Sequence, residues 1–403
     1  MKILLIADVS IAKVLGGAER VLFEQSTRLT RRGYDVHILT RRLERHATDH
    51  EVIQGVTEWR YEADIQKSAG AFLMATYRKG RNLFEKLHKD HNFDLIIIYQ
   101  PFSGLGVIRS PLGKKIRKIY TCFSFSFEEF ISRNTCKDGL LQKYKYLINI
   151  HTRKWIENRA LRSCDKIVVL SQYTRERLWD VYHIPPQNIS IVPGGIDLSR
   201  FQPAKDKQII RRRLNMPDGK VIVFSVRNLV PRMGLENLLK AFKKVVHKAP
   251  DIYLVLGGEG PLKEDLTVLS ENFGLEDFIS FEGFIPEKQL PEYYRMADLF
   301  ILPTRELEGF GLVTLEAMAS GIPVLGTPVG GTKEILGKFD SSFLFENIDS
   351  DSMAASILDN YRQIKDNPEK WQKISCNCRK FVEANYSWEK NIDSLEKILL
   401  TSN

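Results

Sequence analysis

The sequence predicts an α/β protein made of two successive doubly wound, Rossmann-like domains. Short apolar runs alternate with longer helical patterns, which is typical of parallel sheets covered by helices on both faces. The alternation stops in a proline- and glycine-rich segment, residues 193–203, and then starts again. A chain of 403 residues is also longer than one core usually covers. We therefore expect an N-terminal domain at residues 1–195 and a C-terminal domain at residues 196–385.

Each half contains its own series of strands with helices between them. In the first half, strands are expected at residues 2–7, 35–39, 94–99, 118–122, 166–170 and 189–192, with helices such as 18–31 and 154–161. In the second half, strands are expected at 221–226, 253–256, 279–281, 299–302 and 323–325, with helices such as 235–247, 288–296 and 314–319. Ligands of such sheets bind at the carboxyl ends of the strands, so the two domains are expected to face each other across a cleft.

Composition excludes several classes of protein. The chain is 43% apolar and 27% charged, as in ordinary soluble domains. No apolar run approaches the ~18–20 residues that cross a bilayer, and the first run ends at Asp8, too early for a signal peptide. The cysteines (122, 136, 164, 376 and 378) and the histidines lack metal-ligand spacing. We expect a cytoplasmic protein with reduced thiols, no metal and no cofactor.

Charge is unevenly distributed along the chain. Residues 1–200 carry 33 lysines and arginines against 21 acidic residues, whereas the remainder carries 26 against 29. A basic first half favours an anionic partner, such as a membrane surface, a phosphorylated lipid acceptor or nucleic acid. The alternative is a solvated positive face without a partner. The sequence holds no nucleic-acid-binding motif, so nucleic acid is not expected.

The most informative stretch is residues 308–324, where Glu308 and Glu316 lie eight positions apart. Gly309 and Gly311 disfavour a helix, so Glu308 is expected in a loop and Glu316 about a turn and a half inside the helix that follows. A helix N-terminus attracts anions, and a carboxylate accepts hydrogen bonds from hydroxyls. The arrangement suits a nucleotide sugar, which carries both groups. For the glutamate pair alone, a solvated helix face is the alternative.

The spacing of the two glutamates resembles the signature of the retaining nucleotide-sugar glycosyltransferases of family 4. Other motifs of that family follow in the same order over nearly the whole chain. They are Gly16-Gly17-Ala18-Glu19-Arg20, Pro193-Gly194-Gly195-Ile196-Asp197, residues 227–234, Gly257-Gly258-Glu259-Gly260-Pro261 and Gly330-Gly331-Thr332-Lys333-Glu334. The resemblance implies the GT-B arrangement of two Rossmann-like domains, with the last helix, within residues 386–403, returning to the N-terminal domain.

The resemblance also implies roles around the two glutamates. Glu316 would bind the ribose hydroxyls, and Glu308 would contact the donor sugar and stabilise positive character at its anomeric carbon. The backbone N–H groups of Phe310, Gly311 and Leu312 would lie near the sugar and the phosphates.

Two glycine loops match donor-binding loops of the family. Gly283, Phe284 and Ile285 match the loop whose main chain reads the nucleobase, with a simple turn as the alternative. Gly16 and Gly17 would lie over the donor diphosphate, where glycine permits close approach, with an ordinary strand-to-helix turn as the alternative. The spacing is not GxGxxG, so no nicotinamide cofactor is expected.

Two arginines are candidates for binding the leaving group. Arg227 ends the first strand of the second domain, and Arg232 follows in a proline-containing loop. Guanidinium groups at the carboxyl end of a strand suit a departing diphosphate. Family members usually carry a lysine directly before the glycine of this loop. Met233 stands at that position, and Arg232 is the expected replacement for the charge.

The chain departs from the family in the first domain. Related enzymes often place a histidine near the donor sugar, and Phe123 stands at the corresponding position. A phenyl ring cannot make the hydrogen bond of an imidazole. Either this chain does not need that bond, or Ser124, Ser126 or Glu128 on the acceptor side substitutes for it, or the donor differs. Alternatively, Glu128 and Glu129 only form the first turn of a helix, where acidic residues are favourable.

The sequence therefore predicts a metal-independent, retaining glycosyltransferase. It would move a sugar from a UDP- or GDP-sugar to a hydroxyl of a glycan or lipid-linked acceptor, in surface polysaccharide or glycolipid biosynthesis. A front-face reaction is expected, in which the leaving phosphate deprotonates the acceptor. A non-catalytic nucleotide-sugar-binding scaffold and a sugar-nucleotide epimerase on the same fold are the alternatives. The basic clusters and the amphipathic stretch 72–88 predict peripheral contact with an anionic membrane, on its inner face.

Overall fold

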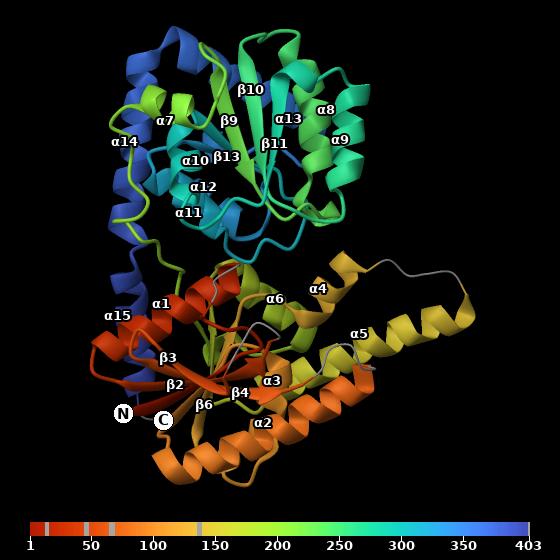
Figure 1. Cartoon of the computed structure of the whole chain (residues 1–403), viewed down its shortest axis with the longest axis vertical. Helices are drawn as coiled ribbons and strands as arrows, with labels where there is room; N and C mark the ends of the chain where they lie inside the picture. Colours follow the sequence, from red (N-terminus) through yellow and green to blue (C-terminus); the bar gives the residue numbers. More distant parts are fainter. Residues whose placement is uncertain (13–15, 44–47, 64–68, 135–138, 402–403) are drawn as a thin grey trace. The chain divides into compact units, whose positions relative to one another are not determined.

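The computed structural model describes residues 1–12, 16–43, 48–63, 69–134 and 139–401 (Figure 1). The chain divides into two compact units. The first runs from Met1 to Pro193 and includes the chain from Ile392 onward, and the second spans Gly194–Asn391. Each unit has a sheet of mainly parallel strands flanked by helices. The predicted α/β fold with two Rossmann-like sheets is confirmed.

In its described part, the first unit contains an eight-stranded sheet of order β3-β4-β2-β1-β5-β6-β7-β8. Neighbouring strands are parallel except for β3 and β4. The strands are β1 (Lys2–Ile6), β2 (Asp35–Arg42), β3 (His50–Ile53), β4 (Val56–Glu62), β5 (Leu95–Ile98), β6 (Arg117–Cys122), β7 (Lys166–Val169) and β8 (Ile189–Ile191).

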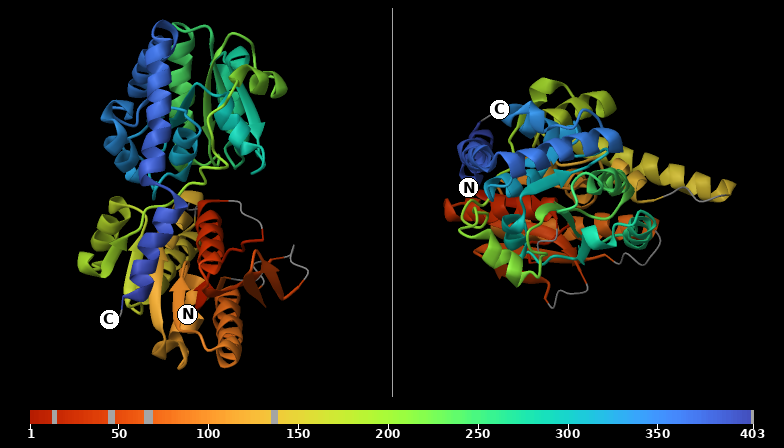
Figure 2. Two further views of the ribbon diagram at one scale, coloured as in Figure 1. Left: turned by 90° about the vertical axis from the view of Figure 1, so that its left-hand side faces the viewer. Right: turned by 90° about the horizontal axis from the view of Figure 1, so that it is seen from above.

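The helices of this unit that the structure describes, except α15, lie between successive strands, as the predicted alternation requires. They are α1 (Gly17–Arg31), α2 (Ala69–His91), α3 (Pro101–Arg109), α4 (Ser126–Arg133), α5 (Leu140–Leu161), α6 (Gln172–Tyr182) and the end of α15 (Trp388–Leu400), with short 3₁₀ turns at Gly113–Lys115 and Pro186–Asn188. Arg117 donates hydrogen bonds to the carbonyls of Ile398 and Leu399, which fixes the end of α15 to β6. The first half of α5 extends away from the rest of this unit (Figure 1, Figure 2).

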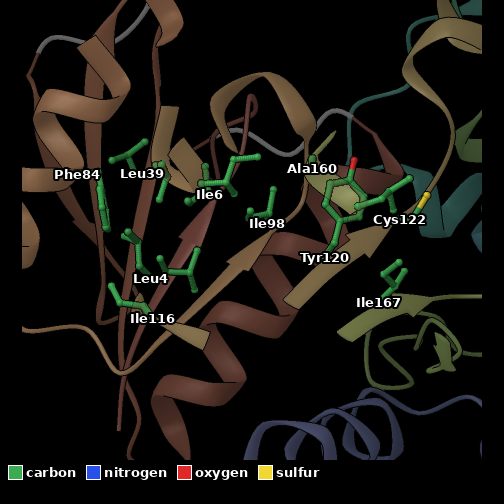
Figure 3. Packing of buried hydrophobic residues seen from close by; sticks show 14 of the residues in the cluster. Leu4, Ile6, Leu39, Phe84, Ile98, Ile116, Tyr120, Cys122, Ala160 and Ile167 are labelled. Carbon is green, nitrogen blue, oxygen red and sulfur yellow. The ribbon is translucent and has the colours of Figure 1, made fainter. Parts of the chain in front are cut away.

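The core of the first unit lies on the apolar strands. Leu4 and Ile6 of β1 pack with Ile98 of β5 and Tyr120 of β6, and all four side chains are fully or almost fully buried (Figure 3). Runs of apolar residues on adjacent parallel strands are what a sheet covered on both faces needs, because neither face meets water.

The second unit holds, among its described residues, a five-stranded parallel sheet of order β11-β10-β9-β12-β13. Its strands are β9 (Val221–Val226), β10 (Ile252–Gly257), β11 (Ile279–Gly283), β12 (Leu299–Leu302) and β13 (Val324–Gly326). Its helices are α7 (Lys207–Arg213), α8 (Leu235–Val246), α9 (Lys263–Asn272), α10 (Leu290–Met296), α11 (Leu312–Ala319), α12 (Gly330–Phe339), α13 (Ser350–Asp366) and α14 (Pro368–Asn385), with 3₁₀ turns at Pro231–Met233, Glu276–Phe278 and Ser341–Phe343.

The hairpin of β3 and β4 was not predicted. In β4, Glu58 and Arg60 occupy buried positions where an apolar residue would be expected. Arg60 Nε donates to Glu58 Oε1 at 2.7 Å, and Glu58 also accepts from Ser10 Oγ at 2.7 Å and from the Ile11 backbone N–H at 2.9 Å. These partners satisfy the buried charges, so a strand with a charged inner face is stable here.

The amphipathic stretch 72–88 lies within α2, and its interpretation as the membrane-contacting helix is wrong. Phe84 and Leu87 are buried in the core of the first unit (Figure 3). The helix packs on β2 and β4, so its apolar face is covered by the sheet. In the part of the chain that the structure describes, no helix combines the length and the apolar character needed to cross a bilayer.

Candidate functional site

The strand order of the second unit reverses between β9 and β12, which lie side by side at its centre. Helices that leave such neighbouring strands cross to opposite faces, and the loops at the carboxyl ends separate there. Arg227 directly follows β9, and Thr304 and Glu308 follow β12. The sheet therefore brings an arginine and a glutamate that lie 81 positions apart to one place.

Arg227 and Glu308 form a buried ion pair across this point. Arg227 Nη2 lies 2.5 Å from Glu308 Oε2, and the two side chains are only 8% and 10% exposed. Thr304 Oγ1 donates to the same carboxylate oxygen at 3.2 Å. Arg227 Nε and Nη2 also contact the sulfur of Met233, at 3.2 and 2.9 Å. Within the described part of the chain, Nη1 makes no hydrogen bond.

Arg232 has a different position from Arg227. Its Nη1 donates to the backbone carbonyl of Leu307 at 3.0 Å, and its own carbonyl accepts from the Arg305 N–H at 2.8 Å. Leu307 has a left-handed backbone conformation with φ of 58°, which is uncommon for a side chain of its kind. Arg232 therefore holds the loop that carries Glu308. Its expected role in place of the family lysine, which is to bind the diphosphate, stays a prediction.

The loop at residues 308–311 is packed against the start of α12. The Gly331 N–H donates to the Glu308 carbonyl at 2.9 Å. A Cβ atom added to Gly331 would lie 2.4 Å from Phe310 Cα. Phe310 is itself buried, and its ring lies 6.1 Å from that of Tyr386. The glycines that open α12 therefore serve close backbone packing that positions the Glu308 loop.

Two hydroxyls lie next to the turn at Gly311, which has φ of 91°. A Cβ atom at Gly311 would come within 2.7 Å of Thr332 Oγ1 and 3.3 Å of Thr314 Oγ1. Both hydroxyls are buried, and neither has a hydrogen-bond partner among the described residues. Buried hydroxyls are usually hydrogen-bonded, so these two hydroxyls beside the Leu312 start of α11 are available to a polar ligand.

Glu316 lies in the second turn of α11, as predicted. It is only 4% exposed, and Tyr294 on α10 donates its hydroxyl hydrogen to Glu316 Oε2 at 2.8 Å. The carboxylate is thereby held in one orientation. Tyr294 could not be predicted from the sequence, because no spacing of residues links α10 to α11.

Gly283 ends β11, and Phe284 and Ile285, which follow it, differ in exposure. Gly283 has φ of 64°, and its carbonyl accepts from the Gly258 N–H at 2.7 Å. Phe284 is 51% exposed, whereas Ile285 is buried against Gly257. This loop lies at the same edge of the sheet as Arg227, since β11 and β10 follow β9 in parallel order.

The first unit has a similar meeting of loops between β1 and β5, where its strand order reverses. Asp8 follows β1, and its Oδ1 accepts from the Ser103 backbone N–H of α3 at 3.1 Å. Burial raises the pKa of the Asp8 carboxyl. Of the predicted residues, Gly16 precedes α1 without a side-chain cap, and Gly17 is the first residue of that helix.

The predicted acceptor-side residues lie after β6. The ring of Phe123 packs 5.8 Å from that of Tyr99. Ser124 is exposed. Glu128 lies in the first turn of α4 and forms an ion pair with Arg177 of α6. Glu128 therefore lies in the first turn of a helix, as the alternative interpretation expected.

Glu157 of α5 was not predicted, although it is fully buried in this region. Its carboxylate accepts from the Ser126 backbone N–H at 3.1 Å, which caps α4, and from Tyr182 Oη at 2.6 Å. Burial raises the pKa of Glu157 to about 7, with the nearby Glu128 acting in the same direction and Arg153 opposing it. A lone glutamate in a helical pattern gives no sequence signal of this kind.

Two family models match the chain. The model described as Glycosyltransferase Family 4 matches residues 15–200, and the model described as Glycosyl transferases group 1 matches residues 206–381. Together they cover nearly all of the chain, and the second includes the Arg227–Glu308 pair and Glu316.

Individual proteins agree with the two models. A mannosylfructose-phosphate synthase of Agrobacterium fabrum is 27% identical over 85% of this chain and 78% of its own length. A GDP-mannose-dependent phosphatidylinositol monomannoside mannosyltransferase of Mycolicibacterium smegmatis is 29% identical over 60% of this chain and 63% of its own length.

Solved structures share the fold. A sucrose-phosphate synthase of Thermosynechococcus elongatus superposes with a TM-score of 0.81 at 23% identity, covering 99% of this chain and 98% of that one. The Anabaena protein HepE, solved with UDP and glucose, has a TM-score of 0.76 at 17% identity and is covered over 99% of both chains.

We predict that Gly331→Ala destabilises the second unit by about 2 kcal/mol or more, because the new methyl group would overlap the backbone of Phe310. Gly337→Ala in the same helix is the matched control. A Cβ atom there meets nothing within 4 Å, so alanine should stabilise the helix by about 0.5–1 kcal/mol. Denaturant unfolding of both variants measures the difference, and equal effects would contradict the packing described for α12.

We predict that Glu157 makes the protein less stable as the pH rises. Because its pKa is raised in the folded state, its contribution is complete below the ordinary pKa near 4.5 and is lost as the pH rises through about 7. Between pH 5 and pH 8, the free energy of unfolding of wild type should fall by about 3 kcal/mol relative to Glu157→Gln. Glu176→Gln, an exposed change on α6, is the control and should leave the slope as in wild type. A Glu157→Gln protein with the wild-type slope would refute the assignment.

Proposed function

Because the chain belongs to glycosyltransferase family 4, we propose that it transfers a sugar from a nucleoside diphosphate sugar, UDP- or GDP-linked, to an acceptor hydroxyl with retention of configuration. The observation that carries the proposal is the buried Arg227–Glu308 pair at the strand reversal of the second unit. It lies beside the start of α11, which carries Glu316. Arg227 and the helix N-terminus suit the diphosphate of such a donor, and the carboxylate of Glu316 suits its ribose.

The diphosphate would bind between Arg227 and the start of α11. Arg227 keeps Nη1 without a hydrogen bond in the described residues, while Nη2 is held by Glu308 and Thr304. The hydroxyls of Thr314 and Thr332 could donate to the phosphates, as could the backbone N–H groups at the helix start. A phosphate there would gain donors that are already in place.

The nucleoside would bind farther along α11 and at the edge of β11. Glu316, oriented by Tyr294, can accept from both neighbouring ribose hydroxyls. The exposed ring of Phe284 would lie near the base, whose edge the backbone of the 283–285 loop would read. This arrangement recognises a ribose without fixing which base it carries.

In the reaction, Arg227 would stabilise the charge that develops on the departing diphosphate. Preorganised charges of this kind are usually the largest contribution to catalysis. The leaving phosphate would deprotonate the acceptor hydroxyl on the same face of the sugar, which gives retention without a covalent intermediate. Since arginine supplies the positive charge, we propose that the reaction requires neither metal nor cofactor.

We propose a glycan or lipid-linked acceptor, and with it peripheral contact with an anionic membrane. The M. smegmatis relative is named for a lipid acceptor, phosphatidylinositol monomannoside. The excess of basic residues in the first 200 positions supports an anionic partner for the first unit. Surface polysaccharide or glycolipid synthesis would use such a substrate.

We predict that Glu316→Gln weakens binding of the nucleoside diphosphate sugar about tenfold or more, because the charge that strengthens the bonds to the ribose is lost. The amide keeps an oxygen for Tyr294, so the fold should be retained. Titration calorimetry with UDP- and GDP-sugars measures the affinity. Glu306→Gln, an exposed glutamate two positions before Glu308, is the control. Wild-type affinity in Glu316→Gln would remove Glu316 from the donor site.

We predict that Arg227→Lys lowers the rate of nucleoside diphosphate release about 10- to 100-fold, since lysine keeps the charge but loses the planar fork. The slow hydrolysis of donor by water is the assay, because it needs no acceptor. Arg305→Lys changes an exposed arginine of the same loop region and should leave the rate unchanged. A wild-type rate in Arg227→Lys would exclude Arg227 from stabilising the leaving group.

A further inference from the structure

Helix α5 carries large apolar side chains that are exposed in the part of the first unit that the structure describes. Each of these residues is between 47% and 90% exposed, and they are Leu140, Leu141, Tyr144, Leu147, Ile148 and Trp155. The first half of the helix, which carries all of these residues except Trp155, extends away from the rest of the first unit (Figure 1, Figure 2). A concentration of exposed apolar side chains on one element marks an interaction surface.

These side chains form one stripe along the helix. Positions 140, 144, 147, 148 and 155 recur at intervals of three, four and seven, which places them on a single face. The opposite face is used within the unit: Ile156 and Leu161 are buried, and Tyr146 packs 5.4 Å from the ring of Phe130 on α4. The exposed stripe is therefore separate from the face that holds the helix in place.

Cations border the stripe on both sides. Lys143 and Lys154 lie along one edge and Lys145 along the other, and all three are exposed. Arg109 of α3 lies over the ring of Trp155, with 5.5 Å between its guanidinium carbon and the ring centroid. Between positions 139 and 156 the sequence contains four lysines and arginines and no aspartate or glutamate.

We propose that this face of α5 docks on the surface of an anionic lipid bilayer. Leucine and isoleucine would enter the boundary between headgroups and acyl chains, and the lysines would bind lipid phosphates. Tyr144 and Trp155 suit the same boundary, because each has an apolar ring and a polar atom. The helix would lie in the plane of the surface.

The composition of the stripe distinguishes a bilayer from other partners. A second copy of the chain would bring the same lysines of both copies together, which like charges oppose. A nucleic acid could stack on Tyr144 and Trp155, but it would leave Leu140, Leu147 and Ile148 exposed. An anionic bilayer satisfies the cations and the aliphatic side chains at once.

The inference rests on the proposed function only in naming the anionic membrane as the partner, and it assigns that contact to α5. It does not depend on sugar transfer. Binding to vesicles can therefore be measured without donor, and donor hydrolysis can be measured without vesicles. Failure of one leaves the other intact.

The test is co-sedimentation of the full chain with phosphatidylglycerol–phosphatidylcholine vesicles and with vesicles of phosphatidylcholine alone. Wild type should bind the anionic vesicles at least tenfold more tightly, and added salt should weaken that binding. The double variants Leu140→Gln/Leu147→Gln and Lys143→Gln/Lys145→Gln should each bind the anionic vesicles at least tenfold more weakly than wild type. All four positions are exposed, so the fold should not change.

Ile209→Gln, which alters an exposed apolar residue of α7 in the second unit, is the matched control and should bind like wild type. Donor hydrolysis should be unchanged in every variant. The proposal would be overturned if wild type did not bind anionic vesicles, or if either double variant bound them as tightly as wild type does. A wild-type dimer in solution that the leucine variant abolishes would overturn it in favour of a second copy.

Discussion

The buried ion pair between Arg227 and Glu308 is the interaction on which the second unit's site depends. Each charge alone would be costly to bury, and together they are stable only while the loops after β9 and β12 stay in register. The strand order brings these loops together, and the bond from Arg232 to the Leu307 carbonyl keeps the second loop in its left-handed turn. The position of the guanidinium thus follows from the topology of the sheet.

The first unit has the same kind of reversal in its strand order, with the carboxyl group of Asp8 at that point. Asp8 follows β1 and is held by the start of α3 beyond β5, as Arg227 and Glu308 are held in the second unit. On its far side, Glu157 caps α4 and joins it to α6 through Tyr182. Both units therefore place polar groups where parallel strands end, while apolar side chains fill the sheet itself.

The sequence identified the elements that are apolar and regular, and it failed where charges are buried or where partners are far apart in the chain. Alternating runs predicted both sheets, and Gly309 and Gly311 correctly put Glu308 in a loop and Glu316 in the helix that follows, which begins at Leu312 instead of the predicted position 314. The β4 strand was missed because Glu58 points inward and is stabilised by tertiary partners. The contact of Met233 with Arg227 links the substituted family position to the site through sulfur, which spacing alone does not show. The assignments of ligand groups to these residues stay predictions.

Thermal unfolding with UDP, GDP and ADP in the absence of metal tests whether the second unit binds a nucleoside diphosphate at the reversal of its strand order. A ligand that binds only the folded state raises the melting temperature by mass action. We expect a clear rise with one nucleotide, and a smaller rise with that nucleotide in the Glu316→Gln protein. No rise with any of the three, or a rise that the substitution leaves unchanged, would contradict such binding.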